Sequence, residues 1–232
     1  GNPYSEIILR PYQFCNLSEE VVRESDTLTT LKEKVRLATI LGTFQATLTN
    51  FRYLRKIWQK NTEEERLLGV SLTGIMDNAL TATSGVKLET ALEILRAESV
   101  ATNAAMAIQL GIPQFAAVTC VKPSGTVSQL TDAASGIHAR HNPYYIRTVR
   151  GDNKDPLTQF LVSQGIPAEP DVMKPDSTTV FSFPMKSPMN AVTRTGMTAI
   201  EQLDLCLTYQ RHWCEHKPSV TISVKDNEWM DV

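Results

Sequence analysis

The sequence of 232 residues predicts an α/β fold in which strands and helices alternate along the chain. Short apolar runs bounded by glycine or proline, typical of strands, take turns with longer stretches in which apolar residues recur every three or four positions, typical of helices. No short period repeats, and no low-complexity linker divides the chain. We therefore expect a single domain over residues 1–232 with about five strands in a parallel or mainly parallel sheet.

The expected elements follow in chain order. A helix of about twenty residues follows the Thr- and Asp-rich stretch 25–30, because apolar residues recur at helical spacing from Leu31 to Leu48. A second long helix runs from Leu88 to Gly111 after a short apolar strand at 66–74. The charged segment 61–66 is expected to be a capped, solvated helix start. The remaining strands are expected at 115–121, 144–150, 177–183 and 219–224, and the remaining helices after 122–126, at 155–165 and at 196–215.

Composition limits the classes of function. The 23 basic and 25 acidic residues give a net charge of -2, so no strong field favours nucleic acid or an anionic membrane. No apolar run reaches the roughly 18 residues of a membrane span, and the first residues lack a signal-peptide pattern. The four cysteines lie far apart, which predicts a reduced, cytoplasmic compartment. Because the chain starts at Gly1 without Met, we expect a piece of a longer reading frame that begins with a tag-removal scar.

The segment VKPSGTVSQL (121–130) is a candidate phosphate-binding loop. It follows an apolar strand and precedes a helical stretch, so backbone N–H groups and hydroxyls of Ser124, Thr126 and Ser128 can surround a phosphate. Gly125 would let the backbone come close to the ligand. A Pro-Ser-Gly turn with Thr126 as a helix cap explains the same residues without a ligand. From this segment alone, both interpretations stay open.

Four ordered segments carry a resemblance to a known family: NPYSEI, QFCNL, VKPSGTVSQLTDAASGIHARHNPYYIRTVR and WCEHKPSVTISVKDNEW. Together they closely resemble the catalytic subunit of ribonucleotide reductases, in particular the adenosylcobalamin-dependent class II enzymes. That family folds as a ten-stranded α/β barrel whose two five-stranded halves are joined by a finger loop. The resemblance implies that residues 1–18 are the finger-loop segment and residues 19–232 the second half of the barrel.

The resemblance also implies site residues. In the family, the finger loop carries Asn-Pro-Cys-x-Glu, and its cysteine becomes a thiyl radical that abstracts the 3′ hydrogen of the ribose. Asn2 falls on the amide that holds the ribose hydroxyls, and Glu6 on the general base for the 3′-OH. Cys15 matches the cysteine that reduces the substrate together with a partner cysteine from the first barrel half. The family's phosphate-binding loop maps onto Pro123, Ser124, Gly125, Thr126 and Ser128, which favours the phosphate interpretation.

Tyr4 stands at the position of the radical cysteine. An S–H bond is close in strength to the ribose C–H bond, whereas a phenol O–H bond is weaker and the ring is larger. Ser5 does not substitute, because its O–H bond is too strong and an extended loop points it the opposite way. We expect no reductase turnover from this chain alone, which also lacks the first barrel half and the family's C-terminal tail of shuttling cysteines. A divergent homologue and an altered or erroneous sequence both explain Tyr4.

Other reactive side chains are assigned structural roles. Tyr144 and Tyr145 are expected to pack in a core rather than carry a radical. The segment Cys214-Glu215-His216 offers possible metal ligands, but adjacent positions at a helix end point in different directions, so we expect a capped helix terminus and no metal site. Three cysteines match no family motif and are expected to be small core residues: Cys120, Cys206 and Cys214.

Two classes of function follow. The first is the C-terminal catalytic part of a class II ribonucleotide reductase, with adenosylcobalamin as cofactor, a ribonucleoside di- or triphosphate as substrate and a thioredoxin-type reductant. The second is a non-catalytic nucleotide- or phosphate-binding homologue, or a split-subunit module complemented by a separate N-terminal barrel half. An iron-dependent class I subunit matches the Pro-Ser-Gly-Thr and NPYYIR segments less well. A half barrel exposes strand edges and an apolar face, so we also expect self-association into a homo-oligomer.

Overall fold

The computed structural model describes residues 6–230 and 232. The chain divides into two compact units, Gly1–Arg140 with Asn190–Val232 and His141–Met189. Each unit has its own sheet. The prediction of one domain over residues 1–232 stays a prediction. None of the helices in the described part of the chain is long and apolar enough to cross a membrane.

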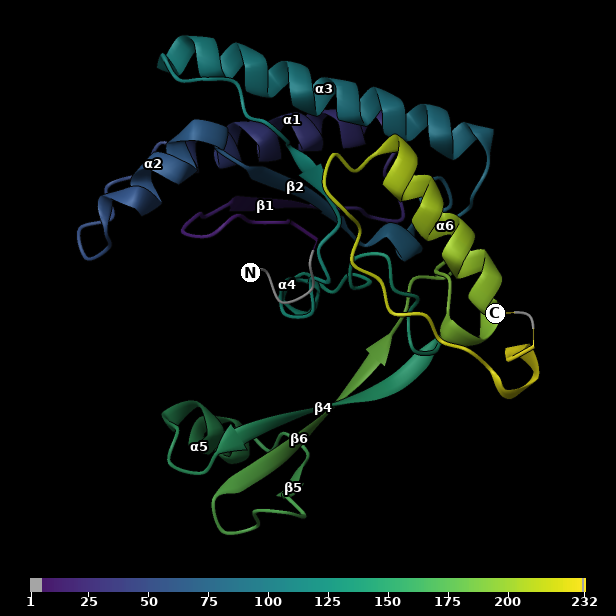
Figure 1. The fold of residues 1–232 in the computed structure, drawn as a ribbon. Helices are drawn as coiled ribbons and strands as arrows, with labels where there is room; N and C mark the ends of the chain where they lie inside the picture. The colour runs from purple at the N-terminus through teal and green to yellow at the C-terminus, as the bar shows by residue number, and fades with distance from the viewer. Residues whose placement is uncertain (1–5, 231) are drawn as a thin grey trace. The chain divides into compact units, whose positions relative to one another are not determined.

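The larger unit is built on a parallel sheet of β1 (Asn16–Val21), β2 (Leu68–Thr73) and β3 (Thr119–Cys120), in the order β1-β2-β3. Helices α1 (Leu28–Gln45) and α3 (Val86–Leu110) pack on each other along one face of this sheet (Figure 1). Helix α6 (Ala199–His212) packs against α3. The strand–helix alternation predicted from the sequence is therefore confirmed for this unit.

The core of the larger unit lies between the sheet and its helices. Strand β2 is buried along its whole length, and Leu68, Val70 and Leu72 alternate toward the helices. Tyr209 and Trp213 of the α6 region complete the cluster, and both are fully buried. Burial of such side chains is worth about 1.5–3 kcal/mol each, so this layer supplies much of the folding free energy.

Helix ends follow the expected chemistry at α1, α3 and α6. Thr27 and Thr30 form a capping box before α1, and Thr198 forms one with Glu201 before α6. Gly111 ends α3 in the left-handed conformation.

The expectation of a helix start at 61–66 is wrong, because these residues form the end of α2 (Lys56–Glu65) and its left-handed cap. Short helical turns complete the unit: α4 (Val127–Leu130), η1 (Ile75–Asp77), η2 (Arg194–Gly196) and η3 (Asp226–Glu228).

The smaller unit is an antiparallel sheet with one helix. Its strands β4 (Tyr144–Asp152), β5 (Ala168–Pro170) and β6 (Thr178–Lys186) lie in the order β4-β6-β5, and α5 (Pro156–Ser163) follows β4. The expectation of a mainly parallel sheet therefore holds only for the larger unit. The prediction that both tyrosines pack in a core is wrong for Tyr144, which is 70% exposed. Tyr145 is half-buried, and its ring contacts the His141 ring.

Two strand predictions also differ from the structure. Segment 219–224 forms no strand; only Pro218 bridges to Val121. The strand expected at 115–121 is limited to two residues. Conversely, β1 begins at Asn16, inside the segment 1–18 that was expected to be a loop.

Candidate functional site

The candidate site lies on the sheet face opposite to α1 and α3. The parallel register aligns Glu19 of β1 with Ser71 of β2, and Ser71 with Cys120 of β3. Successive side chains alternate between faces, so these three residues face away from the helix-covered core that Leu68, Val70 and Leu72 enter. This face therefore carries polar and thiol groups over a buried strand.

The segment before β1 brings Glu6 and Cys15 to this face. Ile7 is buried in a small cluster with Leu67 and Cys120, and half-buried Cys15 packs against the same cluster. The Lys217 N–H donates to the Glu6 carbonyl at 3.0 Å and anchors the strand entry. Two residues of the predicted site, Asn2 and Tyr4, lie outside the described residues.

The charge of Glu6 acts on the Cys15 thiol. Burial raises the pKa of the Cys15 thiol, the negative charge of Glu6 raises it further, and the positive charge of Lys122 partly offsets both. Burial, followed by the charge of Glu6, also raises the pKa of Cys120 far above that of an ordinary thiol. Both cysteines are therefore protonated thiols at neutral pH.

Lys122 and Glu19 form an ion pair that sequence reasoning missed. Lys122 Nζ lies 3.7 Å from Glu19 Oε2, and both side chains are largely buried. Burial raises the pKa of Glu19, and Lys122 lowers it. Two features of the sequence could have indicated this pair: Lys122 directly precedes Pro-Ser-Gly, and Glu19 lies at every second position with the apolar residues Leu17 and Val21, as on one face of a strand.

The loop after β3 is fixed from both sides. The Lys122 N–H donates to Ser71 Oγ at 2.8 Å, and Ser135 Oγ donates to the Pro123 carbonyl. Gly136 adopts a φ of +53°, and a Cβ there would lie 2.4 Å from the Lys122 carbonyl, so only glycine permits this approach. These contacts hold the backbone that leads into the loop.

The tip of the loop is open to a ligand. Ser124 takes the left-handed conformation (φ 55°) and is buried, whereas Gly125 is exposed, and a Cβ on Gly125 would meet no atom within 4 Å. Thr126 precedes α4 without a side-chain cap hydrogen bond, which removes the capping explanation for this residue. Ser128 is fully buried within α4. Because α4 has four residues, its dipole contributes little.

A buried ion pair holds the segment behind the loop. Arg140 donates from Nε and Nη2 to the two carboxylate oxygens of Asp77, each at 2.8 Å, and both side chains are 4% exposed. Asp77 Oδ2 also accepts the Ala134 N–H at 2.7 Å. Thr73 at the end of β2 completes the attachment, accepting the Gly136 N–H at 3.0 Å. Arg140 is thus a structural residue of this segment.

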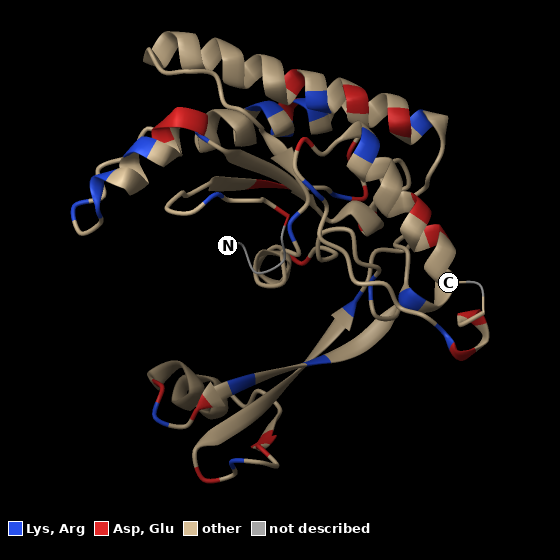
Figure 2. Ribbon diagram, viewed as in Figure 1, with Lys and Arg blue, Asp and Glu red and all other residues tan. Residues whose placement is uncertain are grey.

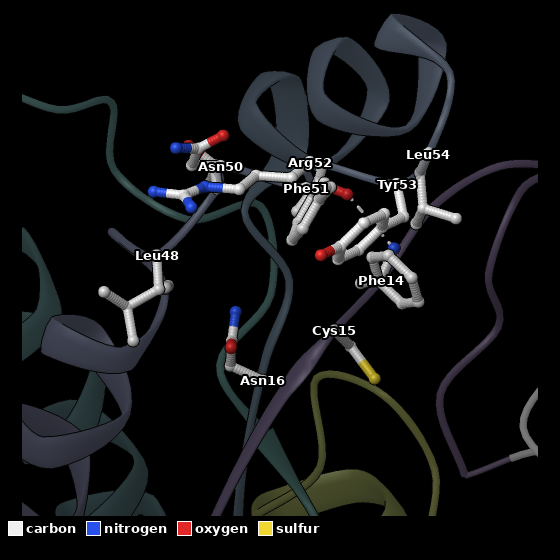
Figure 3. Close-up of a pocket in the computed structure, with 12 residues that line it drawn as sticks. Phe14, Cys15, Asn16, Leu48, Asn50, Phe51, Arg52, Tyr53 and Leu54 are labelled. Atoms are coloured by element: carbon white, nitrogen blue, oxygen red, sulfur yellow. Dashed lines mark hydrogen bonds between the residues drawn. The ribbon is translucent and has the colours of Figure 1, made fainter.

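A hollow next to Cys15, the Cys15 pocket, has a volume of about 640 Å³. It lies between the start of β1, the end of α1 and the loop before α2 (Figure 3). Most of its wall is apolar or aromatic, with polar groups at the edges. Its lining residues are Phe14, Cys15, Asn16, Ala46, Leu48, Thr49, Asn50, Phe51, Arg52, Tyr53, Leu54 and Thr62.

Comparison with known proteins shows which family this arrangement resembles. No protein-family model matches the chain. An adenosylcobalamin-dependent ribonucleoside-triphosphate reductase of Euglena gracilis is 30% identical over 229 residues, and one of Lactobacillus leichmannii is 28% identical over 257. Over nearly its whole length, this chain is similar to adenosylcobalamin-dependent ribonucleotide reductases. The matches cover 96% and 98% of this chain but 30% and 34% of those proteins, so it spans about a third of their length.

The fold agrees with the homology to class II reductases. A crystal structure of a B12-dependent (class II) ribonucleotide reductase matches 97% of this chain with a TM-score of 0.81 and 24% identity, and the match covers 35% of that reductase chain. The resemblance and the fold class predicted from the sequence are therefore confirmed. Cys15 and the entry to the loop at 123–126 lie over the same sheet.

The residues of the WCEHKP segment have separate surroundings and partners. Cys214 is buried, Glu215 accepts the Val118 N–H at 2.8 Å, and His216 Nε2 bonds the Leu68 carbonyl at 2.9 Å. Burial lowers the pKa of His216, which therefore stays neutral at pH 7. The segment ties the end of α6 to the sheet, and Cys120 is buried like Cys214, while Cys206 is half-buried.

Proposed function

We propose that this chain forms the part of a ribonucleotide reductase that holds the ribose and phosphates of its substrate. One observation carries the proposal: the charges of Glu6 and Lys122 both act on the Cys15 thiol, and Lys122 leads directly into the loop at 123–126. The chain's fold matches a third of a class II reductase, which supports this assignment.

Each side chain has a role suited to its state. The Glu6 carboxylate accepts the proton of the ribose 3′-OH as a general base. Cys15, kept protonated by its raised pKa, delivers a hydrogen to the sugar. Two thiols become one disulfide and supply two electrons and two protons, and the 2′-hydroxyl leaves as water. Cys120 is assigned a packing role because it is fully buried and its pKa lies far above that of an ordinary thiol, and the second thiol comes from the first barrel half, as the resemblance implies.

The cofactor named for the relatives is assigned to the whole reductase only. Adenosylcobalamin supplies radical chemistry when bound. The Cys15 pocket, at about 640 Å³, has the size of a site for a drug-sized ligand, and a corrinoid is considerably larger. The pocket therefore does not fit the whole cofactor.

Tyr4 at the place of the radical cysteine is the reason to expect no turnover from this chain alone. The test mixes the chain with the N-terminal part of a class II relative and measures deoxynucleotide formation, before and after Tyr4→Cys. Activity only with cysteine supports a reductase site whose radical residue is replaced. If neither mixture turns over but nucleotides still bind, the non-catalytic binding homologue becomes the better description.

Substrate binding is tested at Gly125. A Cβ there meets no protein atom within 4 Å, so Gly125→Ala leaves the free protein undisturbed and clashes only with a ligand that approaches the backbone. We expect about a tenfold weaker binding of ribonucleoside di- and triphosphates by calorimetry, with an unchanged melting temperature. Unchanged affinity would remove the loop from the substrate site.

A further inference from the structure

The Cys15 pocket has an aromatic wall that the proposed reductase site does not use. Phe14 stacks on Trp58 with ring centroids 4.7 Å apart and meets Phe51 edge-on at 5.0 Å. Tyr53 is 98% exposed. Figure 3 shows Phe14, Phe51 and Tyr53 grouped on one side of the pocket, with Cys15 next to them. A flat ring placed there would cover apolar surface that now faces water.

Basic residues lie at and next to the pocket: Arg52 lines it, and Arg55 and Lys56 follow Leu54 in the chain. Arg52, Arg55 and Lys56 are all exposed, and within residues 6–230 no ion pair involves any of them. The Arg55 guanidinium lies 4.5 Å from the centroid of the Tyr12 ring, which holds it in place. In Figure 3 the Arg52 side chain extends away from the aromatic group, toward Asn50. The pocket thus pairs an aromatic side with a cationic side.

Helix α2 adds to this positive charge instead of balancing it. The helix begins at Lys56 with no acidic residue in its first turn and no side-chain cap, and it ends in Glu63, Glu64 and Glu65. Figure 2 shows the reversal as blue at the start of α2 and red at its end. Helix dipoles favour the opposite order, so a bound anion near Leu54, which lines the pocket, would be favourable.

We propose that the Cys15 pocket is a nucleotide site separate from the loop at 123–126. The base lies against Phe14, Phe51 and Tyr53, and the phosphates pair with Arg52. The volume of about 640 Å³ suits a ligand of this size. This inference goes beyond the proposed function, because a nucleotide here would shield Cys15 from reagents whether or not the chain takes part in reduction.

The test uses ATP and adenosine as probes on the full chain. Calorimetry gives the dissociation constants, and mass spectrometry follows alkylation of Cys15 by iodoacetamide. We expect ATP to slow alkylation several-fold and to bind at least about tenfold more tightly than adenosine. Arg52→Ala should weaken ATP about tenfold and leave adenosine unchanged, whereas Tyr53→Ala should weaken both. Arg36→Ala, an exposed arginine on α1 outside the pocket, is the matched control and should change neither.

Two results would overturn the proposal. The first is that millimolar ATP leaves Cys15 alkylation unchanged, or that adenosylcobalamin alone protects the thiol. The second is that Gly125→Ala abolishes ATP protection, which would place the nucleotide in the loop at 123–126. The proposed function survives either result, because its own test reads ribonucleotide affinity at Gly125 and not the reactivity of Cys15.

Discussion

Cys15 experiences two opposing charges, Glu6 and Lys122, in addition to its own burial. A protonated thiol suits hydrogen delivery, whereas a thiolate would react with oxidants and electrophiles. Beyond its proposed role toward the ribose, the Glu6 carboxylate helps burial to keep the thiol in the form that the proposed chemistry needs.

Removing the charge of Glu6 should make Cys15 more reactive. In Glu6→Gln the negative charge that raises the Cys15 pKa is gone, so more thiolate exists at pH 8 and alkylation should accelerate several-fold. Peptide mass spectrometry over a pH series measures the rate. Glu6→Asp keeps the charge and should behave like the unmodified protein; an equal acceleration in both variants would refute the electrostatic explanation.

Glu20 is an acid buried in the larger unit. Its side chain is 4% exposed, neither carboxylate oxygen has a hydrogen-bond partner among the described residues, and burial raises its pKa well above the ordinary value. Lys34 lowers this pKa and Asp26 raises it, both less than burial does. The folded protein therefore binds this proton more tightly than the unfolded chain.

Stability should consequently fall as pH rises from the unfolded value, about 4.3, through the folded pKa of Glu20. Glu20→Gln has a similar shape but cannot ionise, so it should be more stable than the unmodified protein at pH 8, by about 1–3 kcal/mol, with little difference at pH 4. Urea unfolding at both pH values measures this. Glu33→Gln, at an exposed position of α1, is the control; equal effects of the two variants would argue against the burial explanation.

Among the elements, the connection from Asp77 to Arg140 should dominate the stability of the segment behind the loop at 123–126. Asp77→Asn removes the buried carboxylate that Arg140 contacts from Nε and Nη2 and leaves it the exposed Asp132 carboxylate at 3.2 Å, so we expect a loss of about 2–4 kcal/mol. The exposed Arg10–Glu64 pair is the comparison, and Glu64→Gln should cost less than about 1 kcal/mol. Urea denaturation gives both values, and similar losses would contradict the assignment.

The elements also show what the sequence can predict. Helices α1, α3 and α6 were predictable because their apolar residues recur over several turns and their ends carry Thr27, Gly111 and Thr198. Strand β1 was hidden because Glu19 and Glu20 break its apolar pattern and their burial depends on tertiary contacts. The strand expected at 219–224 has the right composition, but β3 is only two residues long and offers it little to pair with.

For the candidate site, the resemblance named Glu6, Cys15 and the loop at 123–126 together, and their roles stay a prediction. Lys122 and Glu19 come from different strands, and no local pattern reports that their side chains meet. Charge pairs across strands depend on register, which a single sequence does not reveal.

At the scale of the whole molecule, one apolar stripe predicts association. Leu37, Leu41, Phe44 and Leu48 follow helical spacing along α1 and its end, and all four are at least 49% exposed. Such a stripe favours burial against another apolar surface. We expect the 25.8 kDa chain to sediment above its monomer mass at micromolar concentration, and Leu41→Glu to reduce this. Ile108→Glu, an exposed site on α3, should have no effect, and a clean monomer at all concentrations would contradict the expectation.

Finally, the reversed charges of α2 have a consequence for motion. The helix is weak by itself and is secured by residues 10–14: Arg10 donates to the Asn61 carbonyl at 3.0 Å, Asn61 donates to the Pro11 carbonyl at 2.9 Å, and the Phe14 N–H donates to Thr62 Oγ1 at 3.2 Å. Segment and helix must therefore detach as one cooperative unit, at a free energy below that of global unfolding. Because Cys15 directly follows this segment, that local opening would expose its half-buried thiol further than the folded chain does.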